Sequence, residues 1–239
     1  MKHARVTLEE QYKKVLYFIQ DENIRKFTYF ALVDYAPLSF WEIPAAFSAA
    51  CHHESEKQTG EIVENGDGYT VVRLGGKAWH TLRVCNIAKT IIESDEEKIW
   101  DFKKTKVTGT FVGNEMHSLY ADICIASCIL HDIFSLTEGL EWRDTKHRGM
   151  DKNHPYYHRT ELEEVAKRFL SKQVWDFMLR AIESHMWKWS PNPEVIPRRR
   201  SMLSLNSVKE AYDFSEMYRV IEYVHIADLL AAQGEFTGF

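Results

Sequence analysis

Histidine and aspartate side chains stand at unusual places in this sequence, on the apolar faces of predicted helices. His80 heads the apolar stripe of HTLRVCNIAKTII, while His131 and Asp132 end the almost wholly apolar LYADICIASCILHD. Near the end of another predicted helix, His185 follows apolar residues at helical spacing, and Asp228 shares an apolar face in the last one. Four predicted helices therefore each aim a histidine or an aspartate at the protein interior.

Metal binding accounts for this pattern better than core packing does. One histidine on an apolar stripe is most often a hydrogen-bonded core residue, but an isolated buried carboxylate costs roughly several kcal/mol even after relaxation. Asp132 and Asp228 both point inward, and the Lys and Arg residues lie mostly in predicted loops or on outer faces. A divalent ion bound by these carboxylates and by neutral imidazoles would balance the charge. This donor set suits Fe, Mn, Co, Ni or Zn better than Mg, and we expect one or two ions.

Helical periodicity dominates the chain, so the fold is predicted to be mainly α. Residues 1–37 are expected to form an N-terminal helical extension packed on a core of residues 38–239. Helical patterns cover residues 7–19, 22–33, 39–51, 80–92, 115–134, 173–187 and about 207–232. The stretch 115–134 is apolar nearly throughout, which is typical of a central, buried helix.

The remaining segments are predicted to be strands or loops. Two β-prone runs flank an Asn-Gly-Asp-Gly sequence at 65–68 and indicate a small β-hairpin insertion at about 60–76. A second β-prone piece at 106–113 either pairs with this hairpin or forms a loop. Residues 135–159 are polar and contain glycine and proline, which favours a long loop. The sequence TELE at 160–163 is a capping-box pattern and predicts the start of the next helix.

Composition limits the classes of function. The chain has 239 residues, of which 45% are hydrophobic, so it can bury a full core. Its net charge of -5 is not the basic footprint of a nucleic-acid binder, and no stretch reaches the roughly 18 apolar residues of a membrane span. The polar N-terminus does not resemble a secretory signal. Four cysteines without a C-x-x-C pair are typical of a reduced, cytoplasmic protein.

The order H…HD…D resembles the HD superfamily of metal-dependent phosphohydrolases, with His80, His131-Asp132 and Asp228 at its positions. The segments FWEIPAAFSAACHHE, GGKAWHT, AIESHMWKWSPNP and VHIADLLAA are similar to those of a branch common in bacteriophages and bacteria, so the likeness spans roughly residues 38–233. The chain departs from that branch at 49–51, where Ala-Ala-Cys replaces a Gly- and Lys-containing stretch. A substrate contact made by that lysine therefore does not carry over.

The resemblance implies an HD-domain helical bundle and a set of metal ligands. One-metal members would use His80, His131, Asp132 and Asp228. Two-metal members add two histidines between the HD pair and the last aspartate, with Asp132 bridging the ions as the candidate catalytic residue. His185 fits one of these histidines. The other is either His154, which precedes a proline as in relatives, or His158, whose separation from His185 better suits a pair of helices and which we prefer.

The expected reaction is hydrolysis of a nucleotide or a related phosphate ester. One-metal nucleotidases of the superfamily carry an acid at the position of Ser135, so a metal-bound hydroxide is the expected nucleophile. Basic side chains would hold the phosphate, because guanidinium groups bind phosphate through two hydrogen bonds. The candidate substrate-binding residues are Arg83, Lys188, Arg198, Arg199, Arg200 and His52. A surface salt bridge for Arg83 and a solvated loop for the other basic residues are the alternatives.

Two other functions stay open at this point. Some HD proteins are di-iron oxygenases, and a metal-bound or degenerate HD domain can serve as a non-catalytic nucleotide sensor. The expected partner in each case is a small molecule, with neither a membrane nor a nucleic acid. The sequence does not name the substrate or the oligomeric state.

Overall fold

The computed structural model describes the backbone of residues 5–7, 10–45, 53–64, 69–94, 114–135, 153–187 and 208–233. This part of the chain is mainly helical, as predicted. The helices are α1 (Glu10–Leu16), α2 (Glu22–Phe30), α3 (Leu38–Glu42), α4 (Gly76–Ser94), α5 (Asn114–Leu130), α6 (His154–Glu161), α7 (Glu163–Phe169), α8 (Lys172–Ser184) and α9 (Val208–Ala232). A π-helical turn, η1 (Ala31–Tyr35), continues α2, and a 3-10 turn, η2 (Glu54–Lys57), precedes the strands. No helix of the described residues is both long and apolar enough to cross a membrane.

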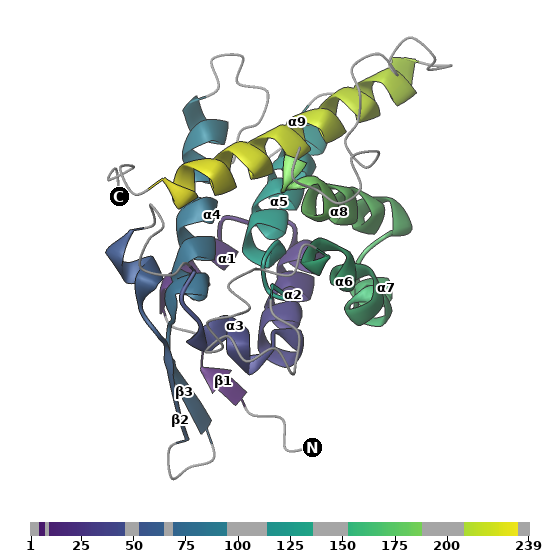
Figure 1. The fold of residues 1–239 in the computed structure, drawn as a ribbon. Coiled ribbons are helices and arrows are strands. Elements are labelled where there is room, and N and C mark those ends of the chain that lie inside the picture. The colour runs from purple at the N-terminus through teal and green to yellow at the C-terminus, as the bar shows by residue number, and fades with distance from the viewer. Residues whose placement is uncertain are drawn as a thin grey trace.

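Helix α5 is the centre of the bundle. The described side chains from Tyr120 to Ser135 are all buried, which agrees with the apolar sequence of this stretch. Helix α5 packs against α4, α8, α9 and α2, and α9 crosses both α4 and α5 (Figure 1). Because α5 is enclosed on several sides, a polar group at its C-terminal end meets neighbouring helices rather than solvent.

Three short strands form a small sheet at one end of the bundle (Figure 1). Strand β2 (Glu61–Glu64) pairs antiparallel with β3 (Tyr69–Arg73), with Glu61 opposite Arg73 and Glu64 opposite Thr70. Strand β1 (Arg5–Thr7) pairs parallel with β3, which the sequence did not predict. The Asn-Gly-Asp-Gly turn on which the hairpin prediction depends lies outside the described residues.

The N-terminal helices share one hydrophobic core with the rest of the bundle. Tyr12 of α1 and Phe27 of α2 are fully buried and belong to the same apolar cluster as Ile123 of α5 and Val224 of α9. Asp21 begins α2, because its side chain accepts hydrogen bonds from the main-chain N–H groups of the second and third residues that follow. Residues 10–35 are therefore part of the packing that holds α4 and α5 in place.

Two predicted boundaries differ from the structure. The expected loop at 135–159 is helical in its last part, because α6 already begins at His154. Pro155 stands in the first turn of α6, where a missing N–H costs no hydrogen bond, and this signal outweighs the capping-box pattern at Thr160. The helix predicted at 39–51 is described only as α3, which ends at Glu42 before Pro44. The β-prone piece at 106–113 lies outside the described residues.

Candidate metal centre

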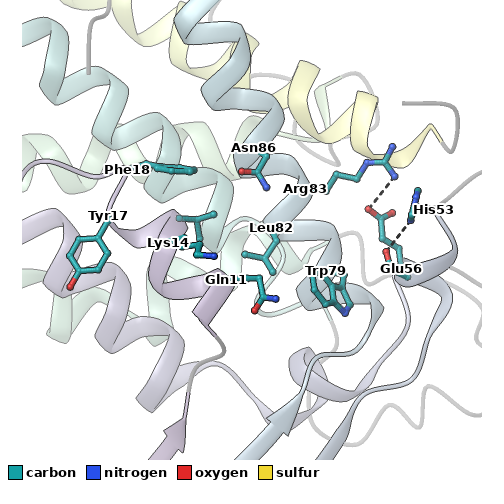
Figure 2. Close-up of a pocket in the computed structure, with 12 residues that line it drawn as sticks. Gln11, Lys14, Tyr17, Phe18, His53, Glu56, Trp79, Leu82, Arg83 and Asn86 are labelled. Carbon is teal, nitrogen blue, oxygen red and sulfur yellow. Dashed lines mark hydrogen bonds and ion pairs between the residues drawn. The ribbon is translucent and has the colours of Figure 1, made fainter. Parts of the chain in front are cut away.

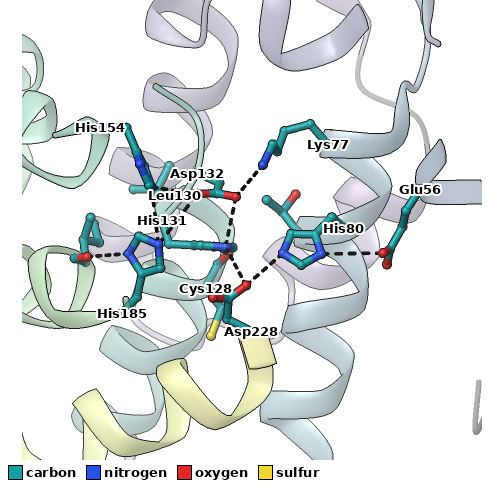
Figure 3. A network of polar contacts seen from close by, with 12 residues as sticks. Glu56, Lys77, His80, Cys128, Leu130, His131, Asp132, His154, His185 and Asp228 are labelled. Atoms are coloured by element: carbon teal, nitrogen blue, oxygen red, sulfur yellow. Dashed lines mark hydrogen bonds and ion pairs between the residues drawn. The ribbon is translucent and has the colours of Figure 1, made fainter. Parts of the chain in front are cut away.

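Six His and Asp side chains from five helical segments meet at the C-terminal end of α5 (Figure 3). Helix α4 supplies one of them, the turn after α5 supplies two, and α6, the end of α8 and α9 supply one each. They are His80, His131, Asp132, His154, His185 and Asp228. Among the described residues they form three overlapping groups, and within each group the potential ligand atoms lie within 4.8 Å of one another.

Asp132 joins the two halves of this cluster. Its Oδ1 lies 2.9 Å from His154 Nε2 and 3.7 Å from His185 Nε2. Its Oδ2 lies 3.6 Å from His131 Nε2, which in turn lies 3.6 Å from Asp228 Oδ1. His80 completes the second half, with its Nε2 2.9 Å from Asp228 Oδ1. Each carboxylate oxygen of Asp132 therefore faces a different set of imidazoles.

The donor atoms fit a metal ion in chemistry and in spacing. His131 Nδ1 donates to the carbonyl of Cys128 at 2.8 Å, and His185 Nδ1 donates to that of Ile182 at 2.7 Å, so the neutral form of each ring presents an Nε2 lone pair to the cluster. His131 Nε2 has no hydrogen-bond partner among the described residues, although it is buried. Two ligand atoms about 2.1 Å from one ion are roughly 3.0–3.4 Å apart, close to the separations within the cluster.

Lys77 and His80 give the cluster positive charge of its own. Lys77 Nζ lies 2.8 Å from Asp132 Oδ2, in a side chain that is only 7% exposed. Burial alone would lower the pKa of His80, but the carboxylates of Asp228 and Glu56 outweigh it and raise this pKa to about 9. The expectation that the cations lie mostly in loops or on outer faces missed Lys77. Lys77 stands three residues before His80, on the same helical face, and this spacing was the signal in the sequence that Lys77 lies beside the cluster.

The remaining pKa shifts follow from burial and from these neighbours. Burial raises the pKa of both aspartates, but Lys77 and His131 outweigh it at Asp132, and His131 and His80 outweigh it at Asp228, so both pKa values lie well below the ordinary range. Burial lowers the pKa of His185 to about 3, so this imidazole is neutral near pH 7. Ionised carboxylates and a neutral imidazole are the protonation states that a metal ion requires.

Glu56 supports His80 from outside the cluster, and sequence analysis gave no sign of it. Its fully buried carboxylate places Oε2 3.7 Å from His80 Nδ1 and Oε1 3.8 Å from Arg83 Nη1. A carboxylate behind a ligand histidine orients the ring and raises its basicity. The close approach of η2 to α4 requires a glycine at Gly76, because a Cβ there would lie 1.7 Å from the Glu56 carbonyl oxygen.

His154, not His158, is the histidine that the structure brings to the cluster. His158 lies one turn further along α6, with Nε2 2.6 Å from the carbonyl oxygen of Leu130 and Nδ1 3.2 Å from that of Pro155. Burial lowers the pKa of His158 to about 4, so the ring is neutral and its one N–H is engaged by the main chain. The preference for His158 rested on its separation from His185, but α6 begins at His154, so His154 stands in the first turn beside the cluster and His158 lies one turn further on, against the Leu130 carbonyl.

Contacts around the ligands fix α6, α8 and α9 relative to one another. Arg159 of α6 makes two-pronged hydrogen bonds to Glu183 of α8, at 2.9–3.1 Å, between the His154 and His185 helices. His225 of α9 donates through Nδ1 to the carbonyl of His185 at 2.7 Å and stacks on Trp187. Helix α8 ends at Ser184, and Trp187, two residues after His185, has a positive φ of 47°, so the helix does not continue past the cluster.

The other predicted site residues are placed as follows. Arg83 Nη1 lies 3.8 Å from the buried Glu56, so the ion pair is largely buried rather than the surface salt bridge of the alternative, and the role of Arg83 towards phosphate stays a prediction. Ser135 is buried, and its main-chain N–H donates a hydrogen bond to the Asp132 carbonyl at 3.1 Å. His52, Lys188, Arg198, Arg199 and Arg200 lie outside the described residues. Asp228 is the most exposed ligand candidate, with a side chain 25% exposed, so the cluster opens to solvent beside α9.

Comparisons with known proteins found no match: no family model fits the chain, and no curated protein and no solved structure is significantly similar to it.

Proposed function

We propose that the chain is a metal-dependent phosphohydrolase of the HD type that acts on a nucleotide or a related phosphate ester. The observation that supports this most is the position of Asp132, whose Oδ1 faces His154 and His185 while its Oδ2 faces His131. A carboxylate placed in this way can bridge two divalent ions. Two-ion sites are common in phosphatases and nucleases.

We assign the six candidate ligands to two proposed ion positions. His80, His131, Asp132 and Asp228 would hold the first ion, and Asp132, His154 and His185 would hold the second. When bound, such ions lower the pKa of a coordinated water and neutralise charge on phosphoryl oxygens. The chain itself fixes the imidazole orientations through main-chain carbonyls and keeps five of the six ligands almost fully buried.

Lys77 is the candidate for binding a substrate phosphate. Its ammonium contacts Asp132 Oδ2, the oxygen that also faces His131. A divalent ion on that oxygen would repel the ammonium strongly at such short range. We therefore expect Lys77 to leave Asp132 when the ion binds and to contact a phosphoryl oxygen of the substrate, since a buried cation needs a new anionic partner.

Metal analysis followed by a substrate screen tests this function. The purified protein would be loaded with Mn, Co, Ni or Fe and offered nucleoside mono-, di- and triphosphates and simple phosphate esters. We expect phosphate release that depends on the metal, is lost in Asp132→Ala, and carries the isotope when turnover is run in labelled water. A fully loaded protein that releases no phosphate and consumes oxygen only with iron would instead be an oxygenase.

One observation favours a second candidate, a non-catalytic ligand-binding domain. Lys77 pairs with Asp132, and His80, with its pKa raised to about 9, pairs with Asp228, so both carboxylates have a positive partner without any ion. This compensation would let the folded cluster exist metal-free. Protein that binds no divalent ion at near-physiological metal concentrations, and still folds cooperatively, would support this candidate over the phosphohydrolase.

A further inference from the structure

A second concave site lies on α4, away from the metal cluster. It is a pocket of about 580 Å³ between α1, the residues that follow it, η2 and α4 (Figure 2). Small-molecule sites in proteins have similar volumes. The residues that line it are Gln11, Lys14, Val15, Tyr17, Phe18, His53, Ser55, Glu56, Trp79, Leu82, Arg83 and Asn86.

The pocket and the metal cluster use different faces of α4. Trp79, Arg83 and Asn86 follow one another at spacings of four and three residues and form one stripe. Lys77 and His80 form another stripe. Successive residues of an α-helix are rotated by about 100° around its axis, so the His80 side chain points well away from those of Trp79 and Asn86. A small molecule in the pocket would therefore contact a surface that the metal ligands do not share.

The lining combines aromatic rings, amides and positive charge. Trp79 lies beside the end of the pocket that Glu56 and His53 form, Phe18 lies towards the other end, and the amide side chains of Gln11 and Asn86 lie between the two rings (Figure 2). Aromatic faces bind flat rings, and an amide offers a donor and an acceptor to a ring edge that carries both. Lys14 adds a cation to the wall. Together these groups suit a nucleobase with an attached phosphate.

Glu56 connects this pocket to the metal cluster. It lines the pocket, and its two oxygens lie 3.8 Å from Arg83 Nη1 and 3.7 Å from His80 Nδ1. Arg83 lines the same pocket. A ligand anion that binds Arg83 would therefore change the position or the hydrogen bonding of Glu56. The change at Glu56 would in turn alter the position or the hydrogen bonding of the His80 ring.

We propose that this pocket binds a nucleoside phosphate as a second ligand, distinct from any substrate at the metal cluster, and that Glu56 transmits its binding to His80. The proposal does not depend on the metal cluster being hydrolytic. Its tests use metal-free protein, so that its failure and a failure of the proposed function are separate results.

Binding is tested with AMP as the probe. We expect saturable quenching of tryptophan fluorescence in the native chain and equally in Asp132→Ala, with the signal lost in Trp79→Phe. By calorimetry, Trp79→Ala should weaken AMP binding about tenfold or more, the usual size of one base–aromatic contact. Asn86→Ala should also weaken it, whereas Tyr29→Ala, an exposed aromatic outside this pocket, should not. Circular dichroism establishes that each variant is folded.

Several outcomes would overturn the binding site. Loss of AMP binding in Asp132→Ala would place the nucleotide at the metal cluster. Unchanged affinity in both Trp79→Ala and Asn86→Ala would exclude the pocket. If ribose 5-phosphate bound as tightly as AMP, the pocket would not recognise the base. If adenosine bound as tightly as AMP, the pocket would not recognise the phosphate.

Transmission is tested by the imidazole resonances of metal-free protein, with that of His80 assigned from His80→Gln. Saturating AMP should shift the His80 resonance, and Glu56→Gln should abolish this shift while AMP still binds. The His158 resonance serves as the reference, because its ring is held by main-chain carbonyls on α6. A His80 resonance that does not move at saturation would rule out transmission through Glu56.

Discussion

The buried stretch 120–135, which covers the described side chains of α5 and the turn after it, has an aspartate near each end, and the two carboxylates have different surroundings. Asp122 accepts main-chain N–H groups of Gln20 and Asp21 at 2.9 and 2.7 Å. Asp132, just after the helix, meets a lysine and three imidazoles, and its Oδ1 lies 2.9 Å from His154 Nε2 and 3.7 Å from His185 Nε2. The first carboxylate ties the start of α2 to the core. The second collects titratable groups, which is typical of functional sites.

Helix α6 repeats this contrast with two histidines. His158 has both ring nitrogens against main-chain carbonyls, whereas His154 Nε2 lies 2.9 Å from Asp132 and 3.3 Å from His185. Both rings are fully buried. Burial of a polar residue therefore does not identify a metal ligand in this chain. A buried histidine or aspartate whose hydrogen bonds are made by the main chain is structural, whereas one that faces other titratable side chains is a candidate metal ligand.

The largest expected effect distinguishes the two aspartates. Asp132→Ala should lose both metal ions, because Asp132 is common to the two proposed ion positions, and it should lower turnover by at least about a thousandfold. Asp122→Ala should retain the full metal content and reduce only stability. Elemental analysis and phosphate release would measure the two properties. Full metal stoichiometry in Asp132→Ala would contradict the assignment.

The two histidines of α6 provide the next comparison. His154→Ala should lose one equivalent of metal and keep the other, since His154 belongs to only one group of ligands. His158→Ala should keep both ions and lower the free energy of unfolding by about 1 kcal/mol or more, because the Leu130 carbonyl loses one of its two donors and keeps only the Ile133 N–H. Metal content and urea unfolding measure both outcomes. Loss of metal in His158→Ala alone would restore the original preference for His158.

The sequence allowed prediction of the central helix and of five of the six clustered residues, because apolar stripes report burial directly. It did not allow prediction of α6, since a proline at the start of a short polar helix gives little periodicity. Lys77 and Glu56 were missed for another reason. A lysine or glutamate in a polar stretch is most often solvated, and their burial depends on how η2 packs against α4 in three dimensions.

Metal removal should have a smaller effect than loss of a ligand. At a free ion concentration about 100-fold above the dissociation constant, one bound ion stabilises the fold by about 2.7 kcal/mol. Because Lys77 and His80 neutralise the carboxylates in the metal-free protein, we expect it to remain folded with a lower Tm. Thermal melts with and without chelator measure this shift. Lys77→Met should enlarge it, since Asp132 then loses its cation, whereas the exposed Lys172→Met should leave it unchanged.

The smallest expected effect concerns Asp122 and pH. Burial raises its pKa to about 7, against the lowering effect of the Gln20 and Asp21 N–H groups. In the unfolded chain its pKa is about 3.9, so between these values the folded state binds more protons and stability falls as pH rises, by at most about 1.4 kcal/mol per pH unit. Asp122→Asn removes this term. Relative to wild type, the variant should therefore be more stable at pH 8 than at pH 5, by on the order of 2 kcal/mol.

Urea midpoints of both proteins, measured in chelator, isolate this difference from the metal cluster. Asp34→Asn, which changes an exposed aspartate, is the matched control and should differ from wild type by the same amount at both pH values. If Asp122→Asn instead lost stability relative to wild type as the pH rose, the two main-chain donors would outweigh burial. Asp122 would then be held ionised, as Asp132 is, and the contrast between the ends of α5 would rest on their partners alone.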